Sequence, residues 1–204
     1  MRGAVADDGS LVLEVERAVL ERRDREGEIV RAVAPGDEGR TVAAALEALR
    51  GAAVHVGLDP SAGVVVVTGI DRAVERAKSA PGGDGALLAA LASDAAWTHD
   101  LANAGMCALP ASLRMDARVE RSARAFVAGR DVQTVQLAGE AARDDRRSPA
   151  VRLAGRLADG AACEATTSYA GDAALPLRGE WTLTTPLSAG LTARRTTSFK
   201  LVLR

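Results

Sequence analysis

Aromatic side chains are almost absent from this sequence: two Trp, two Phe and one Tyr make up 2% of its 204 residues. Proteins that bind single-stranded nucleic acid stack bases on aromatic rings and pair phosphates with clustered basic side chains. Here the arginines are scattered along the chain, and the formal net charge is -1. The sequence lacks both a stacking surface and a basic field, so we expect no nucleic-acid partner.

Long apolar runs are also missing. No stretch reaches the roughly 20 apolar residues that a membrane-spanning helix needs, so we expect no transmembrane segment. The first residues, MRGAVADDGSLVLEVERA, lack the apolar core and the cleavage motif of a signal peptide. Two locations remain open: the cytoplasm, or a compartment reached by an exported protein whose signal lies outside this sequence.

Cysteine and histidine are scarce. Cys107 and Cys163 form a disulfide in an oxidising compartment or stay as two buried thiols, and their spacing does not decide between these alternatives. Neither His55 nor His99 has a second ligand at metal-binding spacing, so we expect no metal site. Cys107 has no basic neighbour that would activate its thiol, and no G-x-S-x-G nucleophile turn is present. The sequence thus predicts no catalytic residue, no cofactor and no enzymatic activity.

One stretch raises a specific alternative, because GVVVVTGIDRAVERA (residues 63–77) has the strand–turn–helix order that opens many nucleotide-binding domains. Such a site needs further glycines after the strand, or a Gly-Lys-Ser/Thr ending. Gly69 is followed by neither, and the carboxylate of Asp71 would occupy the anion position at the helix start. The tight turn before residue 64 favours antiparallel pairing over a parallel crossover. We therefore expect a hairpin followed by a surface helix, without a nucleotide.

Apolar periodicity divides one expected domain, residues 1–204, into three parts. Residues 1–69 contain strands, a short helix and the hairpin just described. Residues 70–109 are helical. Residues 110–204 alternate with period two, which is typical of an antiparallel meander with one face buried.

Within these parts, four segments carry specific predictions. Alternation favours a strand over a helix in residues 11–23, with a second strand returning at residues 29–33. Helical spacing predicts a short helix at residues 41–50. The longest helical pattern extends from an N-cap at Asp84 to a stop at Gly105.

The faces of the meander also follow from the alternation. The Thr-rich stretches 182–185 and 196–198 are interpreted as solvent-facing strand positions, since branched Thr packs well on a pleated surface. The side chains expected on the buried face include Val119, Val135, Leu137, Val151, Leu153, Leu157, Trp181, Leu183, Phe199 and Leu201. The fold class predicted from this order is α+β, with an antiparallel sheet covering a few helices.

Several motifs resemble the LolA-like half-barrel superfamily of secreted and lipoprotein domains. They are the strand GAACEATTSY at residues 160–169, the corner GDAALPLRGEW at 171–181, the Thr-rich strands that follow, and the early hairpin LRGAAVHVGLDPSAGVVVVTG. The resemblance implies a curved antiparallel sheet, a half-barrel, wrapped over helices. It also implies a periplasmic or cell-envelope location and a lipid or lipoprotein partner, and it brings no catalytic residues.

The small and aliphatic inward residues leave two interpretations of the interior. A strongly curved sheet lined by Ala, Val and Leu leaves an apolar groove under the long helix, or the helix packs closely against the sheet. The residues expected around such a groove are Leu88, Leu91, Trp97, Met115 and Trp181. Two functions follow as hypotheses: a non-enzymatic extracytoplasmic domain that binds an apolar ligand, lipid or lipoprotein, or a structural subunit that assembles with partner proteins of the cell envelope.

Overall fold

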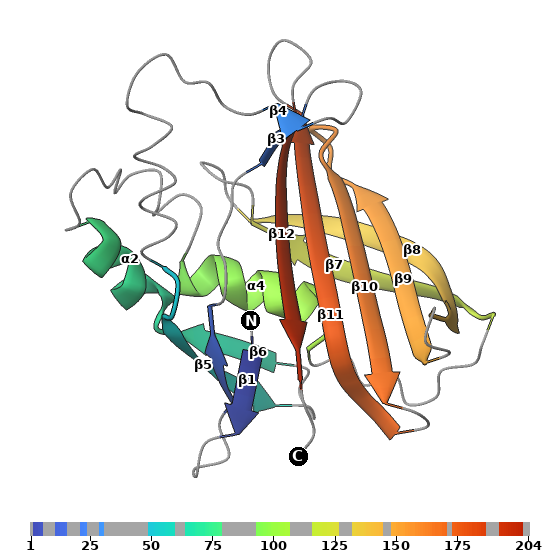
Figure 1. Ribbon diagram of the computed structural model, residues 1–204. Coiled ribbons are helices and arrows are strands. Elements are labelled where there is room, and N and C mark those ends of the chain that lie inside the picture. Colours follow the sequence, from blue (N-terminus) through green and yellow to red (C-terminus); the bar gives the residue numbers. More distant parts are fainter. Residues whose placement is uncertain are drawn as a thin grey trace.

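The structure is a computed structural model of the chain (Figure 1). The described residues are 2–5, 11–15, 21–23, 29–30, 49–59, 64–78, 93–106, 116–126, 132–144, 148–170, 173–186 and 192–201. Most of the predicted helix at residues 41–50 lies outside them.

Strands dominate the described part of the chain. The strands are β1 Arg2–Val5, β2 Leu11–Glu14, β3 Glu21–Arg23, β4 Ile29–Val30, β5 Ala53–Asp59, β6 Val64–Thr68, β7 Arg118–Ala125, β8 Gln133–Arg143, β9 Pro149–Arg156, β10 Ala162–Ala170, β11 Ala173–Pro186 and β12 Thr192–Lys200. Two helices, α2 Ile70–Lys78 and α4 Asp94–Asn103, lie between β6 and β7 in the sequence. The predicted α+β class is confirmed.

The described strands form one open sheet in the order β6-β5-β2-β1-β12-β11-β10-β9-β8-β7, with β3 pairing β12 and β4. The pairs are antiparallel except β1 with β12, which pair in parallel where Arg2 lies opposite Lys200. β2 and β3 confirm strand rather than helix at residues 11–14 and 21–23. Antiparallel pairing of β3 with β4 confirms the returning strand at residues 29–30. Residues 16–20 and 31–33 lie outside the described part of the chain.

The strand that leads to Gly69, β6, pairs with β5 as an antiparallel hairpin. His55 lies opposite Thr68 and Asp59 opposite Val64, so the two strands run antiparallel. A parallel crossover, which a dinucleotide-binding fold requires, is absent from this pair. Helix α2 follows directly after Gly69, as the sequence predicts.

The C-terminal meander is confirmed. Strands β7 to β12 pair in sequence order, each antiparallel to the next. The expected inward residues that are buried are Val135, Leu137, Val151, Leu153, Leu157, Trp181, Leu183 and Phe199, while Val119 and Leu201 are partly buried against them. In Figure 1, β7 and β8 run across the direction of β10, β11 and β12.

The prediction of solvent-facing threonines is wrong at two positions. Thr197 lies opposite Trp181 on the inner face and is buried. Thr182 is also buried, and its hydroxyl lies 3.1 Å from that of its cross-strand neighbour Thr196. Alternation alone places Thr197 inward, and the preference of Thr for exposed strand positions is overridden there by a polar partner on α4, described below.

The prediction of one long helix from Asp84 to Gly105 is also wrong. Ser93 has an extended backbone (φ -152°, ψ 160°), and its hydroxyl accepts the amide of Ala96 at 3.0 Å. Helix α4 therefore begins at Asp94, because Ser93 satisfies one of the free amides of the first turn.

The predicted stop at Gly105 is confirmed. Gly105 has φ +90°, its amide donates to the carbonyl of Ala102, and the amide of Met106 donates to that of Leu101. These two bonds form the Schellman motif, which terminates a helix at a left-handed residue.

Helix α4 contacts both edges of the open sheet. The amide of Val67 in edge strand β6 donates to the hydroxyl of Thr98 at 3.0 Å. The side-chain amide of Asn103 donates to the carbonyl of Arg124 in the opposite edge strand, β7, at 2.8 Å. Helix α4 also contacts β11, β12 and α2, and Ala95 is the only residue of this helix that is exposed.

The C-terminal end of α4 lies against the sheet backbone. A Cβ added at Gly179 of β11 would lie 2.0 Å from the carbonyl oxygen of Ala104. The same carbonyl accepts the hydroxyl of Thr167 in β10 at 2.9 Å. Glycine at position 179 is thus what allows the helix to approach this closely.

We expect Gly179→Ala to lower the free energy of unfolding by about 1–3 kcal/mol, because the added methyl meets backbone that can move only with the whole helix. Urea unfolding measures the change. Gly57→Ala in β5 is the matched control: its Cβ would meet atoms no closer than 3.9 Å, so a change within about 0.5 kcal/mol is expected. Equal effects of the two substitutions would contradict the close contact.

Candidate functional site

The start of α2 is occupied by protein side chains. The carboxylate of Asp94 accepts the amides of Ile70 at 2.7 Å and Asp71 at 3.3 Å. In return, the carboxylate of Asp71 accepts the amide of Asp94 at 3.1 Å. The amides that would bind a phosphate at this helix N-terminus therefore already have an anionic partner. The helix start after Gly69 is therefore a contact between α2 and α4, and its free amides bind a protein carboxylate in place of a phosphate.

A second polar cluster is buried where α4 meets β12. Asp100 is 0% exposed. Its carboxylate accepts a guanidinium N–H of Arg195 at 2.9 Å and the hydroxyl of Thr197 at 2.8 Å. The Arg195 side chain is only 18% exposed, so the two charges form a largely desolvated ion pair.

Arg195 also connects this cluster to the end of β7. It donates to the carbonyl of Phe126 at 2.7 Å, and its guanidinium lies 5.8 Å from the centre of the Phe126 ring. In the sheet order, four strands separate β12 from β7. One arginine therefore joins two strands that are not neighbours in the sheet and the helix between them.

Complete burial raises the pKa of Asp100 above its ordinary value. The charge of Arg195, the hydrogen bonds from Thr197 and Arg195, and His99 act in the opposite direction. The pKa of the neighbouring His99 is lowered, first by burial and then by the charge of Arg124. Burial therefore favours the neutral forms of both side chains.

A third group of polar contacts lies at the end of α4. A guanidinium N–H of Arg121 in β7 donates to the carbonyl of Asn103. Burial lowers the pKa of Arg121, and the nearby Tyr169 opposes this shift. The Nε of Arg121, the Nε of Arg195 and the indole nitrogen of Trp181 are buried without a hydrogen-bond partner in the structure. The inner face thus carries more donors than the described part of the protein satisfies.

These clusters hold α4 in place, and their geometry does not match a catalytic centre. Each acceptor oxygen of Asp100 is used by Arg195 or Thr197, so the carboxylate is not presented to a substrate. Among the residues that the structure describes, no group of three or more His, Cys, Asp or Glu side chains could hold a metal ion. In the same residues, no helix has both the length and the apolar character needed to cross a membrane.

The predicted groove residues are only partly covered by the structure. Trp181 is 0% exposed and lies in the hydrophobic core, whereas Trp97 on α4 is half-buried and packs against that core. Leu88, Leu91 and Met115 lie outside the described residues. The structure thus places Trp181 in the close packing of the inner face and leaves part of Trp97 accessible.

Cys163 is buried on the inner face of β10. Burial raises its pKa to about 11, with smaller contributions from Asp159 and Asp100 in the same direction and an opposing one from Arg195. Cys107 lies outside the described residues, so the pairing of Cys107 with Cys163 stays a prediction.

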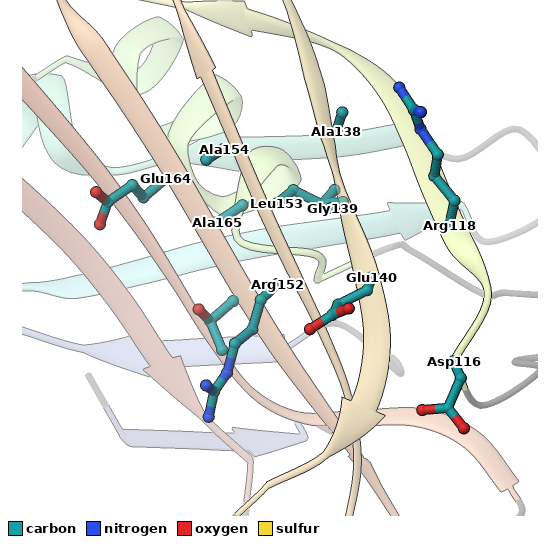
Figure 2. Close-up of a pocket in the computed structure, with 11 residues that line it drawn as sticks. Asp116, Arg118, Ala138, Gly139, Glu140, Arg152, Leu153, Ala154, Glu164 and Ala165 are labelled. Carbon is teal, nitrogen blue, oxygen red and sulfur yellow. The ribbon is translucent and has the colours of Figure 1, made fainter.

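An open concavity of about 770 Å³ lies on the outer face of the sheet, away from α4. Figure 2 shows small side chains between charged ones on β8, β9 and β10. The register explains the depression, because Ala138 lies opposite Ala154, which in turn lies opposite Glu164. The residues that line it are Asp116, Arg118, Ala138, Gly139, Glu140, Arg152, Leu153, Ala154, Glu164, Ala165 and Thr166.

This concavity is the feature that sequence reasoning missed. The exposed alanines of β8 and β9 are visible in the sequence as small residues on a polar face. Their alignment into one depression depends on strand register, which the sequence pattern does not fix across long loops.

Comparison with known proteins gives no relative: no protein-family model, no curated protein and no solved structure matches this chain.

We expect the stability difference between the wild type and Asp100→Asn to depend on pH. The folded state raises the pKa of Asp100 above 3.8, so it binds the proton more tightly than the unfolded state does. The wild type therefore loses stability relative to the variant as pH rises from about 3 towards 7, through the folded-state pKa. Urea unfolding at a series of pH values measures this slope.

The opposite slope for Asp100→Asn would mean that Arg195 outweighs burial and would refute the expected direction.

We expect the thiol of Cys163 to react slowly with a disulfide reagent in the folded protein at about pH 8, because a thiol with a pKa near 11 is almost entirely protonated there. Titration in denaturant without reductant then counts the free thiols. Two thiols mean that Cys107 and Cys163 are not bonded, and none means that they are. Fast labelling of native Cys163, identified by peptide mapping, would contradict its burial.

Proposed function

We propose that this protein is a non-catalytic binding domain in which the antiparallel sheet curves as a half-barrel around α4. Three observations support the curvature. Thr98 and Asn103 of one ten-residue helix contact opposite edges of the sheet. Arg195 of β12 reaches the carbonyl that follows β7. α4 is buried or half-buried at every residue except Ala95.

The ligand class that we propose is an apolar one, a lipid or a lipoprotein acyl chain, in an extracytoplasmic compartment. The observation that carries this proposal is Trp97, which packs against the core and is still partly accessible. The core against which Trp97 packs is aliphatic and aromatic. An acyl chain that lies along Trp97 gains roughly 25 cal/mol for each Å² of apolar surface removed from water. The resemblance to LolA-like half-barrels agrees with this ligand and this compartment.

A brominated fatty acid tests the proposal, because bromine quenches tryptophan fluorescence at close range and the chain has only two tryptophans. We expect saturable quenching of the tryptophan emission in the wild type and in Trp181→Phe, where Trp97 is the only tryptophan. Quenching decreases strongly in Trp97→Phe, because Trp181 is fully buried in the packed core. Native mass spectrometry then gives the stoichiometry.

The outcome that contradicts the ligand proposal is an absence of saturable quenching in all three proteins, together with native masses that contain no lipid. Circular dichroism of each variant checks that the sheet is retained.

A second candidate function is a structural subunit that assembles with partner proteins. The observation that favours it is the outer-face concavity. Small side chains form its floor, and its rim carries both acidic and basic side chains, including Glu140 and Arg152. A rim of mixed charge suits a polar protein surface better than an acyl chain. The alternating charges at its edge lead to the inference that follows.

A further inference from the structure

Among the strands that the structure describes, β7 ends the sheet on one side. The carbonyl of Arg124 accepts from Asn103 on the side away from β8. Residues two apart in a strand face the same way, so the backbone groups of Arg118, Glu120 and Ser122 also face away from β8. Within the described part of the protein, no hydrogen bond is made by these outward backbone groups. This eight-residue strand thus presents three alternate residues whose backbone groups can pair with another strand.

The other edge of the sheet is less suited to pairing. β6 has five residues, and the outward amide of Val67 already donates to Thr98. At β7, only the end near Arg124 is covered by α4 in this way. The free portion of β7 is therefore its first half.

The side chains on that free portion alternate in charge. Arg118 and Glu120 are 77% and 64% exposed, and their charged groups lie 2.9 Å apart on the outer face. Charges on an edge strand normally oppose edge-to-edge pairing. A strand with opposite charges two residues apart is different, because a two-fold axis between them places each charge opposite its counterpart on the second strand.

We propose that two copies of this chain pair through their β7 strands, antiparallel, with the two-fold axis at Val119. Arg118 then lies opposite Glu120 of the second copy, and Glu120 lies opposite Arg118 of the second copy. The outward backbone groups of Arg118 and Glu120 form the new ladder, and the sheets of the two copies become continuous. This dimer does not depend on the proposed apolar ligand, since β7 pairs at the outer edge of the sheet.

The neighbouring registers are less favourable. With the axis at Glu120, two carboxylates lie opposite each other, which is destabilising. With the axis at Arg121, Arg118 lies opposite Arg124, so like charges meet again, and the carbonyl of Arg124 already has Asn103 as its partner. Charge and backbone availability together select the axis at Val119.

Sedimentation equilibrium over a range of concentrations tests the dimer with the full chain. We expect the wild type to approach twice its mass of 21.0 kDa as concentration rises. Arg118→Glu and Glu120→Arg each place like charges opposite one another twice, so each lowers the association constant about tenfold or more. The double variant, Arg118→Glu with Glu120→Arg, restores association.

Mixing the two single variants gives a sharper result. One variant carries Glu at both positions and the other carries Arg at both, so an equimolar mixture forms a heterodimer although neither variant self-associates. A wild type that remains a monomer at every concentration overturns the proposal. So does a dimer whose association constant the single variants leave unchanged, because its interface lies elsewhere.

Cross-linking tests the register independently of charge. Residues at the axis form a non-hydrogen-bonded pair, with Cα atoms about 4.5 Å apart, which is within disulfide range. Oxidised Val119→Cys therefore runs as a covalent dimer on a non-reducing gel, while the wild type controls for the native cysteines. Ser122→Cys is the matched variant and is expected not to cross-link, since its Cα atoms lie several residues apart along the paired strands. A cross-link at Ser122→Cys but not at Val119→Cys refutes the register.

Discussion

The position of α4 depends on one buried interaction, the carboxylate of Asp100 with Arg195 and Thr197. A carboxylate that loses all of its water is destabilising by several kcal/mol unless charged and polar groups replace that water. The two groups that replace the water, the guanidinium of Arg195 and the hydroxyl of Thr197, both belong to β12. They lie 95 and 97 residues after Asp100 in the sequence. The helix is therefore stable in this place only when the C-terminal sheet is formed, and the same arginine then reaches the end of β7. Helix docking and the approach of these two strands are one coupled event.

The other polar side chains of α4 determine its orientation. Thr98 bonds to β6, Asp100 bonds to β12 and Asn103 bonds to β7. Apolar contacts carry no direction and would tolerate rotation or sliding of the helix, whereas hydrogen bonds weaken steeply with angle and distance. Gly179 adds a limit on distance, since the helix end lies directly on the backbone there. Together these contacts fix the position of α4 against the sheet, although the helix itself has little apolar character.

The sequence pattern predicted correctly those features that depend only on neighbouring residues in the chain. Period-two alternation placed Val135, Leu137 and Leu153 on the buried face, because side-chain direction along a strand is fixed by geometry. It failed at Ser93, where helix-forming residues on both sides suggested one helix. The break there depends on the cap at Ser93 and on the exchange of carboxylates between Asp71 and Asp94, which is a tertiary contact. Sequence pattern also had no means of pairing Asp100 with Arg195 or of aligning Ala138 with Ala154, since both depend on which strands become neighbours.

The distribution of these contacts bears on how the proposed half-barrel would admit the proposed apolar ligand. The first turn of α4 is bonded to α2 through Asp94, and α2 follows β6 directly, so this end of the helix belongs with the N-terminal hairpin. The second half of α4 is bonded to β12 and β7 through Asp100 and Asn103. Trp97 lies between these two attachments. A ligand that enters beside Trp97 can separate the helix from the C-terminal strands locally and leave both sets of bonds intact. Entry further along α4 would break the buried ion pair, so the proposed apolar site is confined to the part of the helix that carries Trp97.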